Sequence, residues 1–142
     1  MAVPAASGDS LAGLQAEIDR CPFHEFLGLQ AIYSDAGESI IRLPFHRRLG
    51  LAEDSHVFHG GVTAALVDIA AHAAVAIGIG GVAPTIDLRI DYLRTAQGEH
   101  LEALASVLRS GGSVACVDVA VRDPNKEIVV RGRGTYYVGK SG

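Results

Sequence analysis

The longest apolar run of the sequence, residues 62–83, constrains the fold more than any other segment. An acid, Asp68, and an imidazole, His72, lie inside this run. An aspartate at the centre of a membrane-spanning helix costs about 2.5–3.5 kcal/mol, so a buried helix of a globular domain is favoured over a membrane span. The run predicts one helix over residues 60–77, closed by the glycine-rich segment 78–81. Because this helix is apolar nearly all round, other elements must enclose it on most sides.

The composition indicates one folded domain. The chain has 142 residues, of which 49% are hydrophobic and 20% are charged, and these values suit a single globular core. Its net charge is -4 and its lysines and arginines are scattered, which argues against nucleic acid as the main partner. Cys21 and Cys116 lack the close spacing of zinc or redox motifs, and the first residues lack the pattern of a secretory signal. We therefore expect a cytoplasmic protein that binds neither nucleic acid nor membrane.

The first half of the chain predicts a short helix and a hairpin. Leu11, Leu14 and Ile18 recur at helical spacing, so we expect an amphipathic helix over residues 10–20. Two apolar segments flank the turn residues Ala36 and Gly37, which is typical of a β-hairpin; they span residues 29–35 and 38–45. Residues 46–58 have the composition of a loop. We divide the chain into an N-terminal extension, 1–20, that carries the short helix, and a single domain, 21–142.

The last third of the sequence predicts four strands. In residues 85–93 the apolar side chains alternate with charged ones, which predicts a strand with one buried face; the apolar positions are Ile86, Leu88, Ile90 and Tyr92. Three more strands are expected over residues 99–110, 113–123 and 127–138, joined by turn-forming glycines and by the segment 123–126.

The order of these elements predicts the fold class. A hairpin, one long apolar helix and four consecutive strands form an α+β domain with an antiparallel sheet, since no second long helix covers the other face. The sheet must curve around the helix to enclose it. A curved antiparallel β-sheet wrapped around one long central α-helix is the hotdog fold.

Three motifs resemble a known family. The segment HGGVTAALVD at residues 59–68, preceded by CPFHEFLGL and followed by PTIDLRIDYLRTA, resembles the PaaI-type acyl-CoA thioesterases of the hotdog superfamily. The resemblance extends from Cys21 to Val138. It implies hydrolysis of an aryl- or fatty acyl-CoA to a carboxylic acid and free coenzyme A, without a metal or other cofactor. It also implies a homo-oligomer, with a dimer as the minimal unit and a tetramer expected.

The same resemblance implies roles for four residues. Asp68 matches the catalytic carboxylate, which acts as general base or as nucleophile. Gly60 matches the glycine whose backbone N–H polarises the thioester carbonyl, and His59 matches the histidine that supports this helix start. Thr85 lies where relatives carry a serine or threonine that helps to hold the attacking water.

The loop before the helix departs from the family pattern. Relatives usually carry an asparagine six residues before the histidine of the HGG motif, and this chain has Glu53 there. Either Glu53 replaces the amide, or the loop is shifted so that Asp54 or Ser55 takes its place. We assign substrate binding to Glu53, Gly61 and His72. His72, four residues after Asp68, can instead pair with that carboxylate or serve in packing.

The spacing of Gly60 and Asp68 predicts a site shared between two chains. Eight residues of helix separate them by about 12 Å, whereas reacting atoms must approach within about 3–3.5 Å. If both act on one thioester, Gly60 comes from one chain and Asp68 from its neighbour. Three alternatives stay open: Asp68 is a satisfied structural carboxylate, the protein binds acyl-CoA without hydrolysis, or it is a hotdog enoyl-CoA hydratase or dehydratase.

Overall fold

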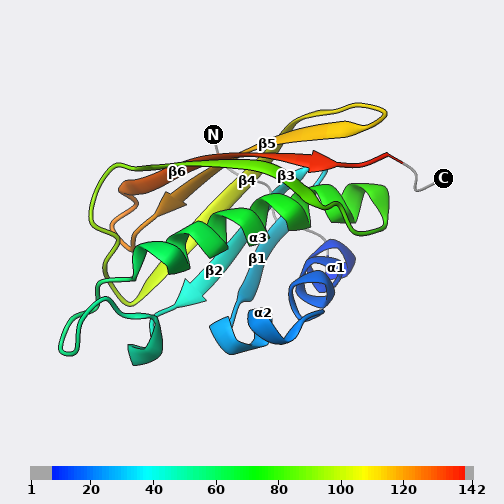
Figure 1. Cartoon of the computed structure of the whole chain (residues 1–142). Helices are drawn as coiled ribbons and strands as arrows, with labels where there is room; N and C mark the ends of the chain where they lie inside the picture. Colours follow the sequence, from blue (N-terminus) through cyan, green and yellow to red (C-terminus); the bar gives the residue numbers. More distant parts are fainter. Residues whose placement is uncertain (1–7, 140–142) are drawn as a thin grey trace.

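The computed structural model describes residues 8–139, and within them the chain forms one curved sheet around a long helix (Figure 1). The elements, in chain order, are α1 (Gly8–Ile18), α2 (Pro22–Leu27), β1 (Gln30–Asp35), β2 (Glu38–Pro44), the short 3-10 helix η1 (Arg47–Leu49), α3 (Gly60–Ile79), β3 (Thr85–Tyr92), β4 (His100–Ser110), β5 (Val114–Arg122) and β6 (Ile128–Tyr137).

The sheet is antiparallel throughout, with the strand order β1-β2-β4-β5-β6-β3. The strand β3 follows α3 in the chain but pairs with β6, so it forms one edge of the sheet. Figure 1 shows α3 lying across the concave face of the curved sheet. The predicted hotdog fold is confirmed, and the central helix extends two residues beyond its predicted end before Gly80 terminates it with a φ of 70°.

The core lies between α3 and the inner face of the sheet. Leu66, Val67 and Ala70 of the helix are fully buried against inner-face residues of the strands. Gly132 of β6 lets this strand pass close to the helix, because an added Cβ there would collide with Val67. By length and composition α3 could cross a membrane, but 56% of its apolar window is buried inside this domain, as in the core helix of a folded protein.

The helix α1, which lies in the N-terminal extension expected over residues 1–20, packs against this core. Leu14 and Ile18 are buried at 0% and 1% exposure, and α1 contacts both β1 and α3. The side chain of Gln15 accepts a hydrogen bond from the backbone N–H of Ala31, which ties α1 to β1. The amphipathic spacing therefore predicted the helix correctly, and the apolar face of α1 packs on the rest of the domain. Residues 1–7 of the expected extension lie outside the described part of the chain.

The helix α2 was not predicted, because six residues are too few to show a period. Local signals nevertheless explain its limits. Pro22 lies in its first turn, where a missing N–H costs nothing, and Gly28 ends it in the left-handed conformation with a φ of 73°.

The strand β3 was predicted correctly, but its expected buried face is only half covered in the single chain. Leu88 and Ile90 pack partly against the core, whereas Ile86 and Tyr92 are both 56% exposed. The physical reason is the position of β3 at the sheet edge, where β6 pairs with one side only. Alternation predicts which side chains share a face but not whether a neighbour covers that face.

A buried acid on the outer face of the sheet joins three strands. Glu102 of β4 is 4% exposed and receives hydrogen bonds from Arg42 of β2 and from Arg122 of β5, at 2.7–3.1 Å. Burial by itself would raise the pKa of Glu102, but the two guanidinium groups outweigh this effect and hold the pKa of the carboxyl below its usual value.

We predict that Glu102→Gln lowers the free energy of unfolding at pH 7 by about 1–3 kcal/mol, because two guanidinium groups lose their anionic partner. The lowered pKa means that this stabilisation is present above pH 4.5, the ordinary value of the carboxyl, and is lost as the pH falls below it. Urea denaturation at pH 7 and pH 4 measures both effects. Glu99→Gln, at an exposed position before β4, is the matched control and should leave stability unchanged; equal stability of the two variants at pH 7 would contradict the prediction.

Candidate active site

The start of α3 presents one open backbone donor. His59 is the N-cap, and its Nδ1 accepts a hydrogen bond from the N–H of Gly61 at 2.8 Å. The N–H groups of Val62 and Thr63 bond to the carbonyl of His59. Among the described residues no acceptor binds the N–H of Gly60. An anionic oxygen near this helix start would therefore meet Gly60 and not Gly61, whose donor is already used.

Two hydroxyl groups fix the position of Gly60. Tyr92, at the end of β3, donates a hydrogen bond to the carbonyl oxygen of Gly60 at 2.8 Å, and Thr63 donates to the same oxygen at 2.8 Å. The first residue of α3, Gly60, is thus tied to the edge strand β3. The aromatic ring of Tyr92 lines this end of the edge and is itself 56% exposed.

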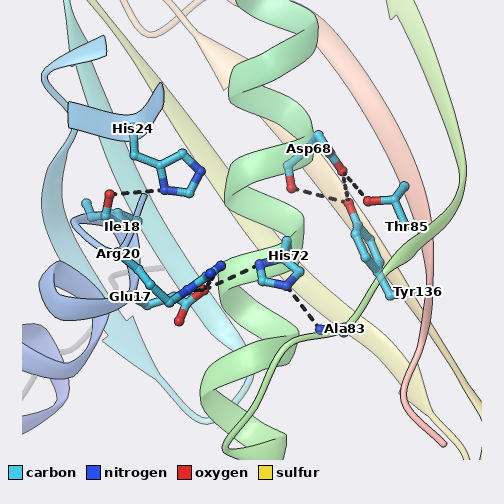
Figure 2. A network of polar contacts seen from close by, with 9 residues as sticks. All are labelled: Glu17, Ile18, Arg20, His24, Asp68, His72, Ala83, Thr85 and Tyr136. Carbon is cyan, nitrogen blue, oxygen red and sulfur yellow. Dashed lines mark hydrogen bonds and ion pairs between the residues drawn. The ribbon is translucent and has the colours of Figure 1, made fainter. Parts of the chain in front are cut away.

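The carboxylate of Asp68 is held on one side only. Its Oδ1 accepts a hydrogen bond from the hydroxyl of Tyr136 at 2.8 Å and another from Thr85 at 3.0 Å, as Figure 2 shows. Asp68 is half-buried, and among the described residues no donor binds its Oδ2. Residues from α3, β3 and β6 meet here, so the side chain is satisfied by neutral donors while one oxygen stays available.

Tyr136 was not identified from the sequence. Two local signals point to it in retrospect. Alternation along β6 places Tyr136 on the same face as Gly132 and Gly134, toward α3. A buried tyrosine usually finds a partner for its hydroxyl, and the central helix offers few polar side chains. Which of them it meets depends on the pairing of β6 with β3, and this is a tertiary property.

His72 does not pair with Asp68. Its Nε2 accepts a hydrogen bond from the N–H of Ala83 at 3.1 Å, and its Nδ1 lies 3.5 Å from Oε1 of Glu17 on α1 (Figure 2). Glu17 also binds Arg20. Burial is the main cause that lowers the pKa of His72, against the opposing charge of Glu17. These contacts are those of a packing residue between α3, α1 and the segment before β3, and they leave neither ring nitrogen open for substrate.

The loop before α3 keeps its polar side chains in solvent. Glu53 is 83% exposed and its carboxylate lies 3.8 Å from the guanidinium of Arg47. Ser55 donates a weak hydrogen bond of 3.5 Å to the carbonyl of Ala52, and Asp54 is exposed. In the part of the chain that is described, none of these side chains bonds to Gly60 or Asp68. The substrate-binding role of Glu53 therefore stays a prediction.

The two halves of the site lie at different positions along one helix. Since α3 is continuous from Gly60 to Ile79, Gly60 and Asp68 are separated by about 12 Å along its axis. Each half is supported by an opposite end of β3, because Tyr92 contacts Gly60 and Thr85 contacts Asp68. Within residues 8–139 no group of three or more His, Cys, Asp or Glu side chains is placed to hold a metal ion.

Comparison with known proteins identifies the family to which this arrangement belongs. A sequence profile described as the thioesterase superfamily matches residues 56–130, which include α3 and β3. The chain belongs to the thioesterase superfamily. The predicted resemblance to this superfamily is thus confirmed.

Two relatives and one solved structure show how far the similarity to other superfamily members extends. A protein of Halobacterium salinarum, whose name assigns it provisionally to the esterases, is 33% identical and aligns over 92% of this chain and 93% of its own. The medium/long-chain acyl-CoA thioesterase YigI of Escherichia coli K12 is 33% identical over 58% of this chain and 63% of its own length. The E. coli PaaI protein, from the phenylacetic acid degradation operon, shares the fold with a TM-score of 0.81 at 22% identity, covering 96% of this chain and 97% of that one.

We predict that His72 makes the stability of this superfamily member pH-dependent. A lowered pKa in the folded state means that the unfolded chain takes up the proton first, so the stabilisation is present above about pH 6.5 and is lost as the pH falls below it. Protonation of His72 at Nε2 also places the new N–H against the backbone N–H of Ala83.

Thermal unfolding of the wild type and of His72→Gln between pH 8 and pH 5 tests this, because glutamine does not titrate. The wild type should lose stability more steeply on acidification than the variant. His56→Gln, which changes an exposed histidine of the loop, is the control and should follow the wild-type slope. Parallel slopes for the wild type and His72→Gln would show that His72 is not the responsible group.

Proposed function

We propose that this protein is an acyl-CoA thioesterase that works as a homodimer. The observation that carries the proposal is the carboxylate of Asp68, because one of its oxygens is held by Tyr136 and Thr85 while the other is open. In a buried structural carboxylate, each oxygen usually has at least one hydrogen-bond partner. An open oxygen beside an exposed sheet edge instead suits a group that acts on water or on a carbonyl carbon.

The substrate class follows from membership of the thioesterase superfamily and from the relatives. The YigI relative is named for medium- and long-chain acyl-CoA, and it aligns across part of its length at 33% identity. We therefore place fatty acyl-CoA first, with aryl-CoA as the second class to test. We expect the acyl chain to lie beside the small side chains of α3, among them Ala64 and Ala65.

The edge strand β3 supports a site shared by two chains. Ile86, Tyr92 and Leu93 expose more than half of their side chains along an edge with no strand partner in the described chain. Two copies can pair their β3 edges in antiparallel fashion about a twofold axis. This pairing brings the end of one β3 opposite the start of the other, so that Gly60 of one chain comes near Asp68 of its partner. The tetramer that the family resemblance implies would join two such dimers and is not needed to complete either site.

The chemistry of the proposed site needs only water and these groups. The thioester carbonyl oxygen accepts a hydrogen bond from the Gly60 N–H of one chain. The helix start stabilises the negative charge that develops on this oxygen. Asp68 of the other chain either removes a proton from water that attacks the carbonyl carbon, or attacks that carbon itself and gives an anhydride that water then opens. In both routes a C–O bond forms, the C–S bond breaks, and coenzyme A leaves as a thiolate that takes up the proton. Thr85 donates to Asp68 and keeps its own lone pairs to accept a hydrogen bond from the water.

We predict that Asp68→Ala lowers kcat for thiol release at least about a hundredfold while the oligomer persists, since the reaction loses its base or nucleophile. A screen of fatty acyl, phenylacetyl and hydroxybenzoyl coenzyme A esters with a thiol-reactive dye measures this, and sedimentation checks the assembly. Asp35→Asn, an exposed acid at the end of β1, is the control. Wild-type rates in the Asp68 variant, or a stoichiometric unhydrolysed complex with the wild type, would overturn the hydrolase assignment. With an enoyl-CoA ester added to the screen, loss of double-bond absorbance without thiol release would indicate a hydratase.

A subunit-mixing experiment tests the shared site. Gly60→Pro removes the proposed donor at the first position of α3, where proline is favoured, and the backbone of His59, with φ -60° and ψ 139°, already suits a residue before proline. This variant should lose about a hundredfold or more in kcat. When it is co-assembled with Asp68→Asn, half of the random dimers are mixed and each contains one intact site, so about a quarter of the wild-type rate should return.

Three controls make the mixing result interpretable. Each variant assembled with itself should stay inactive. Gly60→Ala keeps the N–H and reports the steric effect of a side chain, because its Cβ would lie in ordinary contact with Tyr92 at 3.5 Å. If mixing restores no activity although mixed dimers form, each chain uses its own Gly60 and Asp68, and the shared site is wrong.

A further inference from the structure

Tyr136 donates a hydrogen bond to Asp68 and lies outside the sequence motifs. We propose that Tyr136 is a positioning residue that fixes the carboxylate of Asp68 so that Oδ2 is the oxygen that reacts. This inference rests on the proposed function and assigns a task to a residue outside the motifs of the sequence. It also names the reacting atom.

The geometry carries the inference. Tyr136 is 0% exposed and reaches from β6 to α3, where its hydroxyl lies 2.8 Å from Oδ1 of Asp68 and 3.3 Å from the backbone oxygen of the same residue (Figure 2). One hydroxyl therefore contacts both the side chain and the main chain of Asp68. Together with Thr85, it places two donors on Oδ1, which restricts rotation of the carboxylate group and leaves Oδ2 pointing to where no donor of the described chain binds.

The strand β6 is built to admit the ring of Tyr136. An added Cβ at Gly134, two residues earlier on the same face, would lie 2.5 Å from Cε2 of the ring and 2.7 Å from its hydroxyl oxygen. Real Cβ atoms do not come so close to other heavy atoms, so any larger residue at 134 would push the ring away. Glycine at this position is therefore part of the same arrangement, since it lets the ring lie against the strand and point its hydroxyl at Asp68.

The buried hydroxyl donates to Asp68 and keeps its proton. Burial is the main cause that raises the pKa of Tyr136 well above its usual value, and the negative charge of Asp68 and their hydrogen bond add to it. The phenol therefore stays protonated at neutral pH. It cannot take the proton that Asp68 removes from water, so it holds the base without competing with it.

Thr85 and Tyr136 divide the support of Asp68 between two sides. Thr85 lies on the exposed edge strand, where its hydroxyl can also meet water, whereas Tyr136 approaches from the core. Loss of the edge donor leaves the carboxylate anchored from the core. Loss of the core donor leaves only a hydroxyl that water can displace, and Asp68 can then rotate its reactive oxygen out of line.

The test is a comparison of conservative tyrosine variants in the full-length assembled protein. Tyr136→Phe keeps the ring and removes the donor, so kcat should fall about ten- to a hundredfold while KM changes less than about twofold, because binding of the acyl-CoA does not involve the hydroxyl. Tyr137→Phe, at the exposed next position, and Tyr33→Phe, at a buried position on β1, remove a hydroxyl elsewhere and should keep the wild-type kcat. Sedimentation and thermal unfolding check that each variant assembles.

A second variant keeps the proposal testable if Tyr136→Phe folds poorly. Gly134→Ala retains the hydroxyl but displaces the ring, and it should also lower kcat more than KM. Wild-type kcat in either variant, or a loss of kcat matched by Tyr33→Phe, would overturn the positioning role. Failure of this inference is distinct from failure of the proposed function: if Asp68→Ala is inactive and Tyr136→Phe is fully active, only the role of Tyr136 is wrong, whereas an active Asp68→Ala removes both.

Discussion

The whole arrangement depends on one constraint: an acid lies in a helix that is largely apolar and enclosed. Burying a lone carboxylate costs several kcal/mol, and the structure meets this cost with the hydroxyls of Tyr136 and Thr85. Neither donor is a cation. A neighbouring arginine would have stabilised the ionised acid strongly, as Arg42 and Arg122 do for Glu102 on the outer face of the sheet. Neutral donors hold Asp68 in place without compensating its negative charge.

The same enclosure explains how donors from distant segments reach Asp68. An apolar helix requires a sheet that curves around it, and a curved sheet brings β6 and β3 to the same side of α3. Thr85 and Tyr136 then stand opposite each other in the register of these two strands. The pairing that buries the helix is therefore also the pairing that assembles the support of Asp68.

Much of the fold could be predicted from the sequence, because its periods are long enough to detect. The apolar run gave α3, and alternation gave the hairpin and the four later strands. The short helix α2 could not be predicted, because six residues show no period. The packing of α1 could not be predicted either, because amphipathic spacing does not identify the surface against which the apolar face of a helix packs. The order of strands was also beyond reach, because a strand that follows a helix can join either edge of a sheet.

The candidate site was predictable to a similar extent and for similar reasons. Motif resemblance and helix spacing pointed to Gly60, His59, Asp68 and Thr85, which are close in sequence to recognisable patterns. Tyr136 comes from the last strand, and only tertiary contact connects it to Asp68. The substrate-binding roles of Gly61 and His72 stay predictions, although in this chain the Gly61 N–H binds His59 and the His72 Nε2 accepts from Ala83.

Asp68 and His72, the two ionisable residues of α3, differ in how far their hydrogen-bonding groups are used. His72 has one ring nitrogen bound by Ala83 and the other facing Glu17, so it joins α1, α3 and the segment before β3 into one packed unit. Asp68, one turn earlier, has a filled oxygen and an open one. Both residues cost energy to bury, but only Asp68 keeps an acceptor oxygen, Oδ2, that no donor of the described chain binds. The unused oxygen lies near the strand edge whose apolar side chains are also uncovered, and one event, the arrival of a second copy of the chain at β3, would complete both.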